Sequence, residues 1–171
     1  MNMKKLLSLV LVLCICSFTA CTAAVTEHEI ISQELGIDVA KGQMQVYTDD
    51  HGGFHGDGET YAEIRFSDDD FLRSIQNHPE WSPLPFTPNL QIVVYGGTLP
   101  SGDSWSSFIK DEADQPRIPT LSNGYFFFRD RQSRGQNQND DARIFDRLSM
   151  NFTLAIYDTD TRTLYFYALD T

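Results

Sequence analysis

The segment FTLAIYDTDTRTLYFYA, residues 152–168, has the most regular apolar pattern in the chain. Apolar side chains recur at every second position from Phe152 to Ile156, and again from Leu164 to Ala168. A period of two is typical of a strand that buries one face. Residues 158–161, DTDT, separate the two runs and favour a turn. The segment therefore predicts a C-terminal β-hairpin.

Four further segments are predicted as strands. They are residues 43–48, 59–67, 90–95 and 125–128. The first two alternate apolar and polar residues on either side of a glycine-rich segment, which makes them a second hairpin. The last two are short apolar runs next to the turn formers Gly96-Gly97 and Asn123-Gly124, as interior strands often are.

Short helices are predicted between the strands. Thr26 and Glu29 have the spacing of a capping box, and Gly36 is placed to end the helix that they open. Ser67 and Asp70 repeat the capping-box spacing before a second short helix. Weaker helical spacing is found in two more segments, residues 101–113 and 142–148.

Two segments are unsuited to a regular element. Residues 81–88, WSPLPFTP, hold three prolines and are predicted to be irregular, with Trp81 and Phe86 covering the edge of the core. Residues 129–141 contain almost no apolar side chain that a core could order. They are predicted to form a surface loop, and a lid over a ligand is the alternative.

Together these elements predict an α+β fold. We expect one mostly antiparallel sheet of about six strands, with two to four short helices packed on one face. Parallel pairing of some central strands stays open. Residues 26–171 form a single domain in this interpretation, large enough to bury a core without disulfides.

The connection between the two N-terminal strands, residues 49–58 (DDHGGFHGDG), is the strongest candidate for a functional site. Hairpin loops usually have about 2 to 5 residues, and long loops on rigid scaffolds are enriched in function. The structural alternative is that the glycines only permit a compact loop, that Phe54 covers the core, and that the histidines bond to the backbone.

A metal ion is one ligand that this loop could hold. His51 and His55 could bind zinc, with Asp49, Asp50 or Asp57 as third ligand and water as fourth. Calcium would prefer the carboxylates of the loop, Asp49, Asp50 and Asp57, together with that of Glu59, the next residue. Asp57 and Glu59 could also act as an acid/base pair.

The first 20 residues have the features of a secretory signal. Lys4 and Lys5 precede an apolar run at residues 6–16, which is too short to span a bilayer stably. Small residues then precede Cys21 in the sequence Phe18-Thr19-Ala20-Cys21. An uncleaved signal, with Cys21 as an ordinary residue, is the alternative.

The segment Phe18-Thr19-Ala20-Cys21 resembles the lipobox of bacterial lipoproteins, with Phe18 where that family more often has Leu. The resemblance implies that residues 1–20 are removed and that Cys21 becomes a lipidated amino terminus, carrying acyl chains such as palmitate. Residues 21–25 would be a short tether, and the domain would lie against the extracytoplasmic face of the cell membrane. Residues 51–58 and 151–158 also resemble uncharacterised lipoproteins of Gram-positive bacteria, a likeness that implies no activity.

Removal of residues 1–20 would leave 11 basic against 24 acidic residues, a net charge of −13. So acidic a domain is not expected to bind nucleic acid or to adhere to anionic lipid by charge. Cys14 and Cys16 would be lost with the signal, which leaves no cysteine for a disulfide or a nucleophile within the domain.

Two function hypotheses follow. The first is a membrane-anchored lipoprotein whose domain binds an unknown small ligand or envelope protein. The second is a small metal-dependent hydrolase with His51 and His55 as ligands and Asp57 or Glu59 as base. We favour the first, because the sequence has no serine-hydrolase elbow, phosphate-binding loop or SxxK motif.

Overall fold

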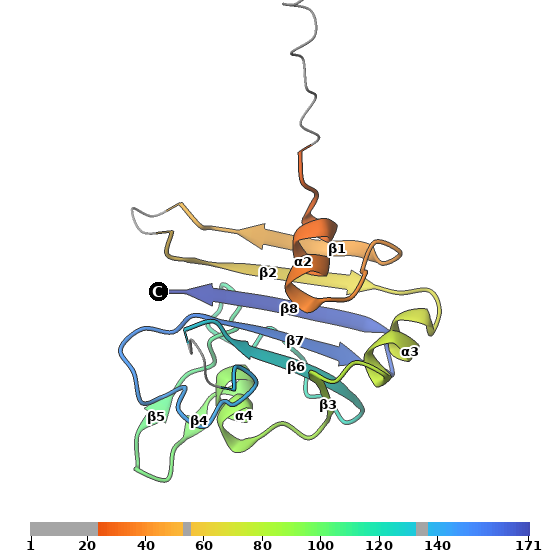
Figure 1. The fold of residues 1–171 in the computed structure, drawn as a ribbon. Coiled ribbons are helices and arrows are strands. Elements are labelled where there is room, and N and C mark those ends of the chain that lie inside the picture. The colour runs from red at the N-terminus through yellow and green to blue at the C-terminus, as the bar shows by residue number, and fades with distance from the viewer. Residues whose placement is uncertain (1–23, 53–55, 133–136) are drawn as a thin grey trace, which may run out of the picture.

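The computed structural model describes residues 24–52, 56–132 and 137–171. Its main element is a six-stranded sheet in the order β1-β2-β8-β7-β6-β3, in which every neighbouring pair is antiparallel (Figure 1). The strands are β1 (Gln43–Asp49), β2 (Gly58–Arg65), β3 (Trp81–Pro83), β6 (Gly124–Asp130), β7 (Phe152–Asp158) and β8 (Thr163–Asp170). A separate ribbon pairs β4 (Gly97–Thr98) with β5 (Ser104–Trp105).

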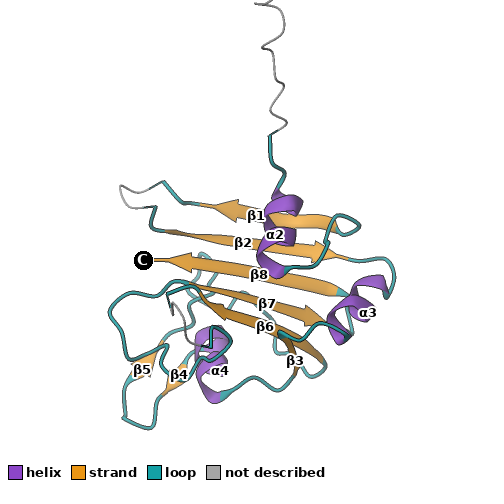
Figure 2. Ribbon diagram, in the orientation of Figure 1, coloured by secondary structure: helices purple, strands orange, loops and turns teal. Residues whose placement is uncertain are grey.

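Within the described residues three helices accompany the sheet, coloured purple in Figure 2, so the predicted α+β class is confirmed. They are α2 (Glu27–Leu35), α3 (Asp70–Gln76) and α4 (Pro88–Tyr95). The predicted C-terminal hairpin is confirmed as β7–β8, which lies in the middle of the sheet. The sheet contains no parallel pair among the described residues, so the parallel alternative does not apply.

Both faces of the sheet are covered, which corrects the expectation that the helices share one face. Helices α2 and α3 pack their buried Leu35 and Phe71 in one cluster with Ile64 and Phe166 of the sheet. A second cluster on the opposite face joins α4 to the sheet and to the long loops that follow it; it includes Leu90, Val94, Ile109, Ile118, Ile144, Phe128 and Ile156. The sheet is the middle layer because β6, β7 and β8 are apolar on both faces.

The predicted helix starts have different outcomes. At α2 the capping box is complete: the Thr26 hydroxyl accepts the Glu29 amide, and Glu29 accepts the Thr26 amide. Gly36 ends the helix in the left-handed conformation, as predicted. The second capping box is wrong, because α3 is preceded by Asp69 and no side chain caps it.

The secondary structure predicted from the sequence is wrong mainly in residues 81–95. Trp81–Pro83 is a strand, and its proline is tolerated because β3 lies at the edge of the sheet. The predicted strand at residues 90–95 is instead the buried helix α4. Thr87 caps this helix by accepting the Leu90 amide at 3.2 Å, and Pro88 occupies its first turn.

Two weak helix predictions are also wrong. Residues 101–113 contain the short strand β5 and turns, and residues 142–148 form turns with Leu148 fully exposed. Apolar side chains of the two segments nonetheless pack together: the ring centre of Trp105 lies 5.8 Å from that of Phe108 and 5.1 Å from that of Phe145. The prediction that Trp81 and Phe86 cover the core is confirmed as well.

Ion pairs hold Arg129 and Asp130, the first two residues of the segment that is predicted to be a surface loop. Arg129 and Asp130 complete β6. The side chain of Asp130 is 4% exposed, and the Arg147 guanidinium donates to both of its oxygens at 2.8 and 2.5 Å. Arg129 donates to Glu80 at 2.9 Å. Paired charges thus replace apolar contacts here. Residues 133–136, and with them part of the predicted lid, lie outside the described residues.

Candidate functional site

The predicted site loop leaves β1 at Asp49 and returns to β2 at Gly58, beside the end of β8. Asp49 of β1 pairs with Thr60 of β2, so these two side chains lie on the same face. Glu59 directly precedes Thr60 in β2 and pairs with Leu169 of β8. Successive residues of a strand point to opposite faces. The candidate carboxylates of Asp49 and Glu59 therefore lie on opposite faces of the sheet, and the loop contributes to two separate sites.

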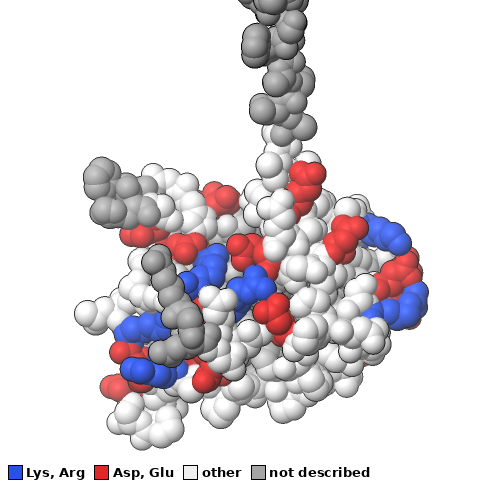
Figure 3. Space-filling model, in the orientation of Figure 1, with Lys and Arg blue, Asp and Glu red and all other residues white. Residues whose placement is uncertain are grey.

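The first site lies on the α2 face and is centred on His51. Its Nδ1 is 2.6 Å from Oδ1 of Asp49, and its Nε2 is 3.3 Å from Oδ2 of Asp170, the last residue of β8. Arg131 donates to the same Asp170 oxygen at 2.8 Å. Figure 3 shows acidic and basic side chains interspersed on this side of the molecule, although the chain as a whole is acidic.

This arrangement favours a charged imidazole. Partial burial of His51 opposes the charged form, but hydrogen bonding and charge from Asp49, and then from Asp170, outweigh it, so the pKa of His51 is raised. The hydrogen bond from His51 correspondingly lowers the pKa of Asp49. Both imidazole nitrogens are thus engaged with carboxylates, and a metal ion would have to displace one of them.

The remaining predicted ligands are placed only in part. Asp57 is exposed, and His55 lies outside the described residues. Within residues 24–52, 56–132 and 137–171, no group of three His, Cys, Asp or Glu side chains is arranged to hold a metal ion. The zinc and calcium sites and the Asp57/Glu59 pair stay predictions. Cys21 also lies outside the described residues.

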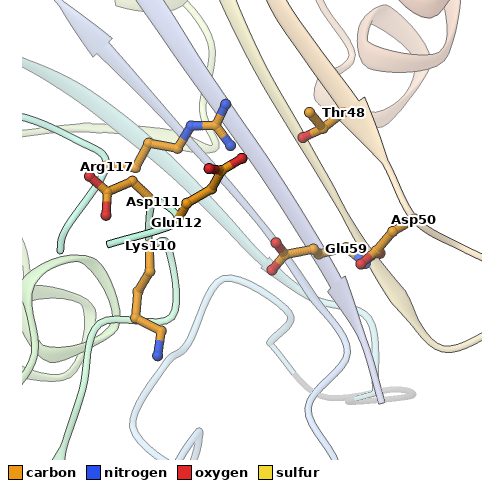
Figure 4. A pocket seen from close by; sticks show the side chains of 7 residues that line it. All are labelled: Thr48, Asp50, Glu59, Lys110, Asp111, Glu112 and Arg117. Carbon is orange, nitrogen blue, oxygen red and sulfur yellow. The ribbon is translucent and has the colours of Figure 1, made fainter. Parts of the chain in front are cut away.

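The second site is a pocket of about 470 Å³ on the α4 face, shown in Figure 4. One wall is the edge hairpin β1–β2 with the start of its loop. The other wall is the long connection between β5 and β6. The pocket is lined by Thr48, Asp50, Glu59, Lys110, Asp111, Glu112 and Arg117.

Three charged side chains of this pocket bond to nearby parts of the protein. Asp50 accepts the amide of Glu59 at 2.5 Å, which ties the two ends of the hairpin loop together. Asp111 accepts the amides of Ala113 and Gln115, both at 2.9 Å, and so shapes its own turn. Lys110 forms an ion pair with Asp114. These groups build the wall of the pocket.

The other three charged side chains face the pocket space. In Figure 4 the Glu59 carboxylate points from the strands toward the loop, and Glu112 and Arg117 point from the loop toward the strands. The guanidinium carbon of Arg117 lies 3.7 Å from the ring centre of Tyr61, in a cation–π contact. Glu59 accepts the hydroxyl of Tyr167 at 2.7 Å through Oε2.

Tyr167 and Tyr61 donate hydrogen bonds to carboxylates on the same face of the sheet. Burial, followed by hydrogen bonding to Glu59, raises the pKa of Tyr167. Burial, followed by hydrogen bonding to Glu63, raises the pKa of Tyr61. Both hydroxyls therefore stay protonated at neutral pH and hold the adjacent carboxylates in place.

Sequence reasoning identified Glu59 as a site residue but missed Glu112 and Arg117. Glu112 lies in residues 101–113, which are predicted as a weak helix, and Arg117 lies four positions after the end of that segment. The available signal was the run Lys110-Asp111-Glu112-Ala113-Asp114, five residues with four charges directly after an aromatic segment. Only the fold places this run against the hairpin loop.

Comparisons with known proteins give this chain no family. No family model matches it, and neither a curated protein nor a solved structure is significantly similar to it. Among the helices of the described residues, none has the length and apolar character needed to cross a membrane.

Proposed function

We propose that this protein is a lipid-anchored, extracytoplasmic domain of the cell envelope that binds a small ligand. The observation that carries the binding role is the pocket between the edge hairpin and the β5–β6 loop. Its volume of about 470 Å³ lies within the range of small-molecule sites, about 300 to 1,000 Å³. Charged groups from two segments that are distant in the sequence converge in it.

The anchor is proposed from the sequence. Charge, length and small residues before Cys21 together favour a lipoprotein signal. Stable anchoring requires more than one acyl chain, as the lipobox resemblance implies. The first described residue is residue 24 and α2 begins at Glu27. The domain would therefore begin within a few residues of the membrane surface.

The anchor is tested by expressing the full chain in bacteria supplied with an alkyne analogue of palmitate. We expect the label in the wild-type chain, which should sediment with membranes. The Cys21→Ser variant should carry no label and keep the longer, uncleaved mass. Cys16→Ser is the matched control and should be labelled like the wild type. Equal labelling of Cys21→Ser and wild type, or no label in either, would contradict the anchor.

The binding role is tested separately on the purified full chain in detergent. A ligand that binds only the folded state raises the midpoint of thermal unfolding. We expect one class in a panel of small amines, carboxylates, phosphates and zwitterions to raise it, and Glu112→Gln to reduce the shift. If no class raises the midpoint, the small-ligand role is refuted, whatever the labelling shows.

A further inference from the structure

We propose that the pocket binds a free basic amino acid, with its ammonium groups on Glu59 and Glu112 and its carboxylate on Arg117. This inference rests on the binding role proposed above and does not depend on the anchor. It follows from the difference between the charged side chains of the pocket that already bond within the protein and those that do not.

Glu112 is the clearest ligand-facing group. It is exposed, and it makes no hydrogen bond or ion pair with any other described residue. Its neighbours on either side, Asp111 and Ala113, are held by the Asp111 turn. The backbone that carries Glu112 is therefore fixed, although its carboxylate is free to accept a hydrogen bond from a ligand.

Glu59 supplies a second acceptor from the opposite wall. Its Oε2 accepts the Tyr167 hydroxyl, which orients the carboxylate and leaves Oε1 for a ligand. Glu59 is only partly exposed, and a charge-assisted bond to an ammonium group is stronger there than at an open surface. The two glutamates thus offer ammonium acceptors on two sides of one space.

Arg117 supplies the anion-binding group. The face of its guanidinium is occupied by the Tyr61 ring, and no acid lies within ion-pair distance of it among the described residues. The N–H groups of a guanidinium lie in its plane, so stacking leaves them free at the edge. A ligand carboxylate can accept two of these N–H groups side by side.

The balance of these charges selects the ligand class. Two of the groups that face the pocket space are carboxylates and one is a guanidinium, a net charge of −1 for these three; with Asp50, Asp111 and Lys110 the lining as a whole carries −2. A basic amino acid carries two cationic groups and one carboxylate, which complement Glu59, Glu112 and Arg117 one by one. A diamine lacks the partner for Arg117, and a dicarboxylate would face both glutamates. Specificity then comes from unfavourable contacts as well as favourable ones.

The test is calorimetric titration of the full chain in detergent with three probes. L-lysine has all three groups, 1,5-diaminopentane lacks the carboxylate, and glutarate lacks the ammonium groups. We expect L-lysine to bind about tenfold or more tightly than 1,5-diaminopentane, because one charge-assisted pair is lost. Glutarate should not bind measurably.

Three variants locate the binding. Glu112→Gln, Glu59→Gln and Arg117→Gln should each weaken L-lysine binding by about tenfold or more. Glu59→Gln keeps an acceptor for Tyr167, and Glu112→Gln alters an exposed side chain, so both should fold. Each variant has a matched control outside the pocket. Glu27→Gln on α2 removes one negative charge, like the glutamate variants, and Arg143→Gln removes one positive charge, like Arg117→Gln. They should bind like the wild type.

Two results would overturn the inference. One is no heat of binding with L-lysine to a protein that unfolds cooperatively. The other is equal binding by wild type and Glu112→Gln, which would place any lysine elsewhere. If Arg117→Gln fails to fold, because its contact with Tyr61 is lost, the Glu112→Gln comparison still decides. A thermal shift by another ligand class alone would refute this inference and leave the binding role intact.

Discussion

The two long hairpins of the sheet, β7–β8 and β1–β2, differ in position and in what joins them. The β7–β8 hairpin occupies the centre, and every residue of β7 is buried. It closes through a short turn that follows Asp158. The β1–β2 hairpin lies at one end of the sheet, and no residue of β1 is fully buried. Its strands are joined by the glycine-rich loop.

The difference shows where this fold has room for chemistry. The central hairpin uses side chains on both faces to hold the layers together, so a polar substitution there would disturb the core. The edge hairpin has one outer strand whose polar side chains reach solvent. Both the group of side chains around His51 and the pocket lined by Glu59, Glu112 and Arg117 form at the loop end of this hairpin. Stability is thus concentrated in one hairpin and candidate function in the other.

The largest expected effect comes from removing a central aromatic side chain. Phe166 of β8 is 1% exposed. Phe166→Ala should lower the free energy of unfolding by about 3–5 kcal/mol, because it leaves a cavity between the sheet and the helices. Met44→Ala on β1 is the matched edge variant and should cost about 1–2 kcal/mol, since Met44 is half-buried. Urea unfolding measures both. Equal losses would mean that β1 belongs to the core as fully as β8.

The two hairpin connections can be compared through their aspartates. Asp158 is buried, and it accepts the Asp160 amide at 2.9 Å and the Thr161 hydroxyl at 2.6 Å. Asp158→Ala should cost about 1–3 kcal/mol by leaving these donors without a partner. Asp50 makes one such bond at an exposed position, so Asp50→Ala should cost about 0.5 kcal/mol. A larger loss for Asp50→Ala would show that the long loop is fixed as firmly as the tight turn.

The fold was predictable where a pattern had a period. Alternation in residues 152–168 predicted the central hairpin, and the Thr26 capping box predicted the start of α2. The apolar run of α4 has no period because three consecutive residues, Ile92, Val93 and Val94, are all buried, so it was mistaken for a strand. The start signal Thr87-Pro88 is present in the sequence, but Pro88 was counted with Pro83 and Pro85 as evidence for an irregular segment.

The candidate site was predictable only in its local part. Asp49 and His51 are two residues apart and do meet, as proximity in a turn suggests. Their third partner, Asp170, is joined to them by strand pairing between β2 and β8. The fold likewise brings Glu59, Glu112 and Arg117 to one pocket. No local pattern links residues that are 50 or more positions apart in the sequence.

The smallest expected effect is a pH dependence that arises at the edge hairpin. The pKa of His51 is raised above its ordinary value of 6.5 by Asp49 and Asp170, so the folded state binds a proton more tightly than the unfolded state. The stabilisation is fully present below pH 6.5 and is lost as the pH rises through the higher folded pKa. For a partly exposed pair we expect a loss of about 0.2–1 kcal/mol.

Urea unfolding of wild type and His51→Asn between about pH 5.5 and 8.5 measures this dependence, because the carboxylates stay ionised over the whole range. The wild type should lose stability relative to His51→Asn as the pH rises. Titration of the His51 ring by NMR gives the pKa directly. A value at or below 6.5 would mean that Asp49 and Asp170 do not hold the imidazole in solution, and that the loop after β1 is less tightly joined to β8 than its contacts indicate.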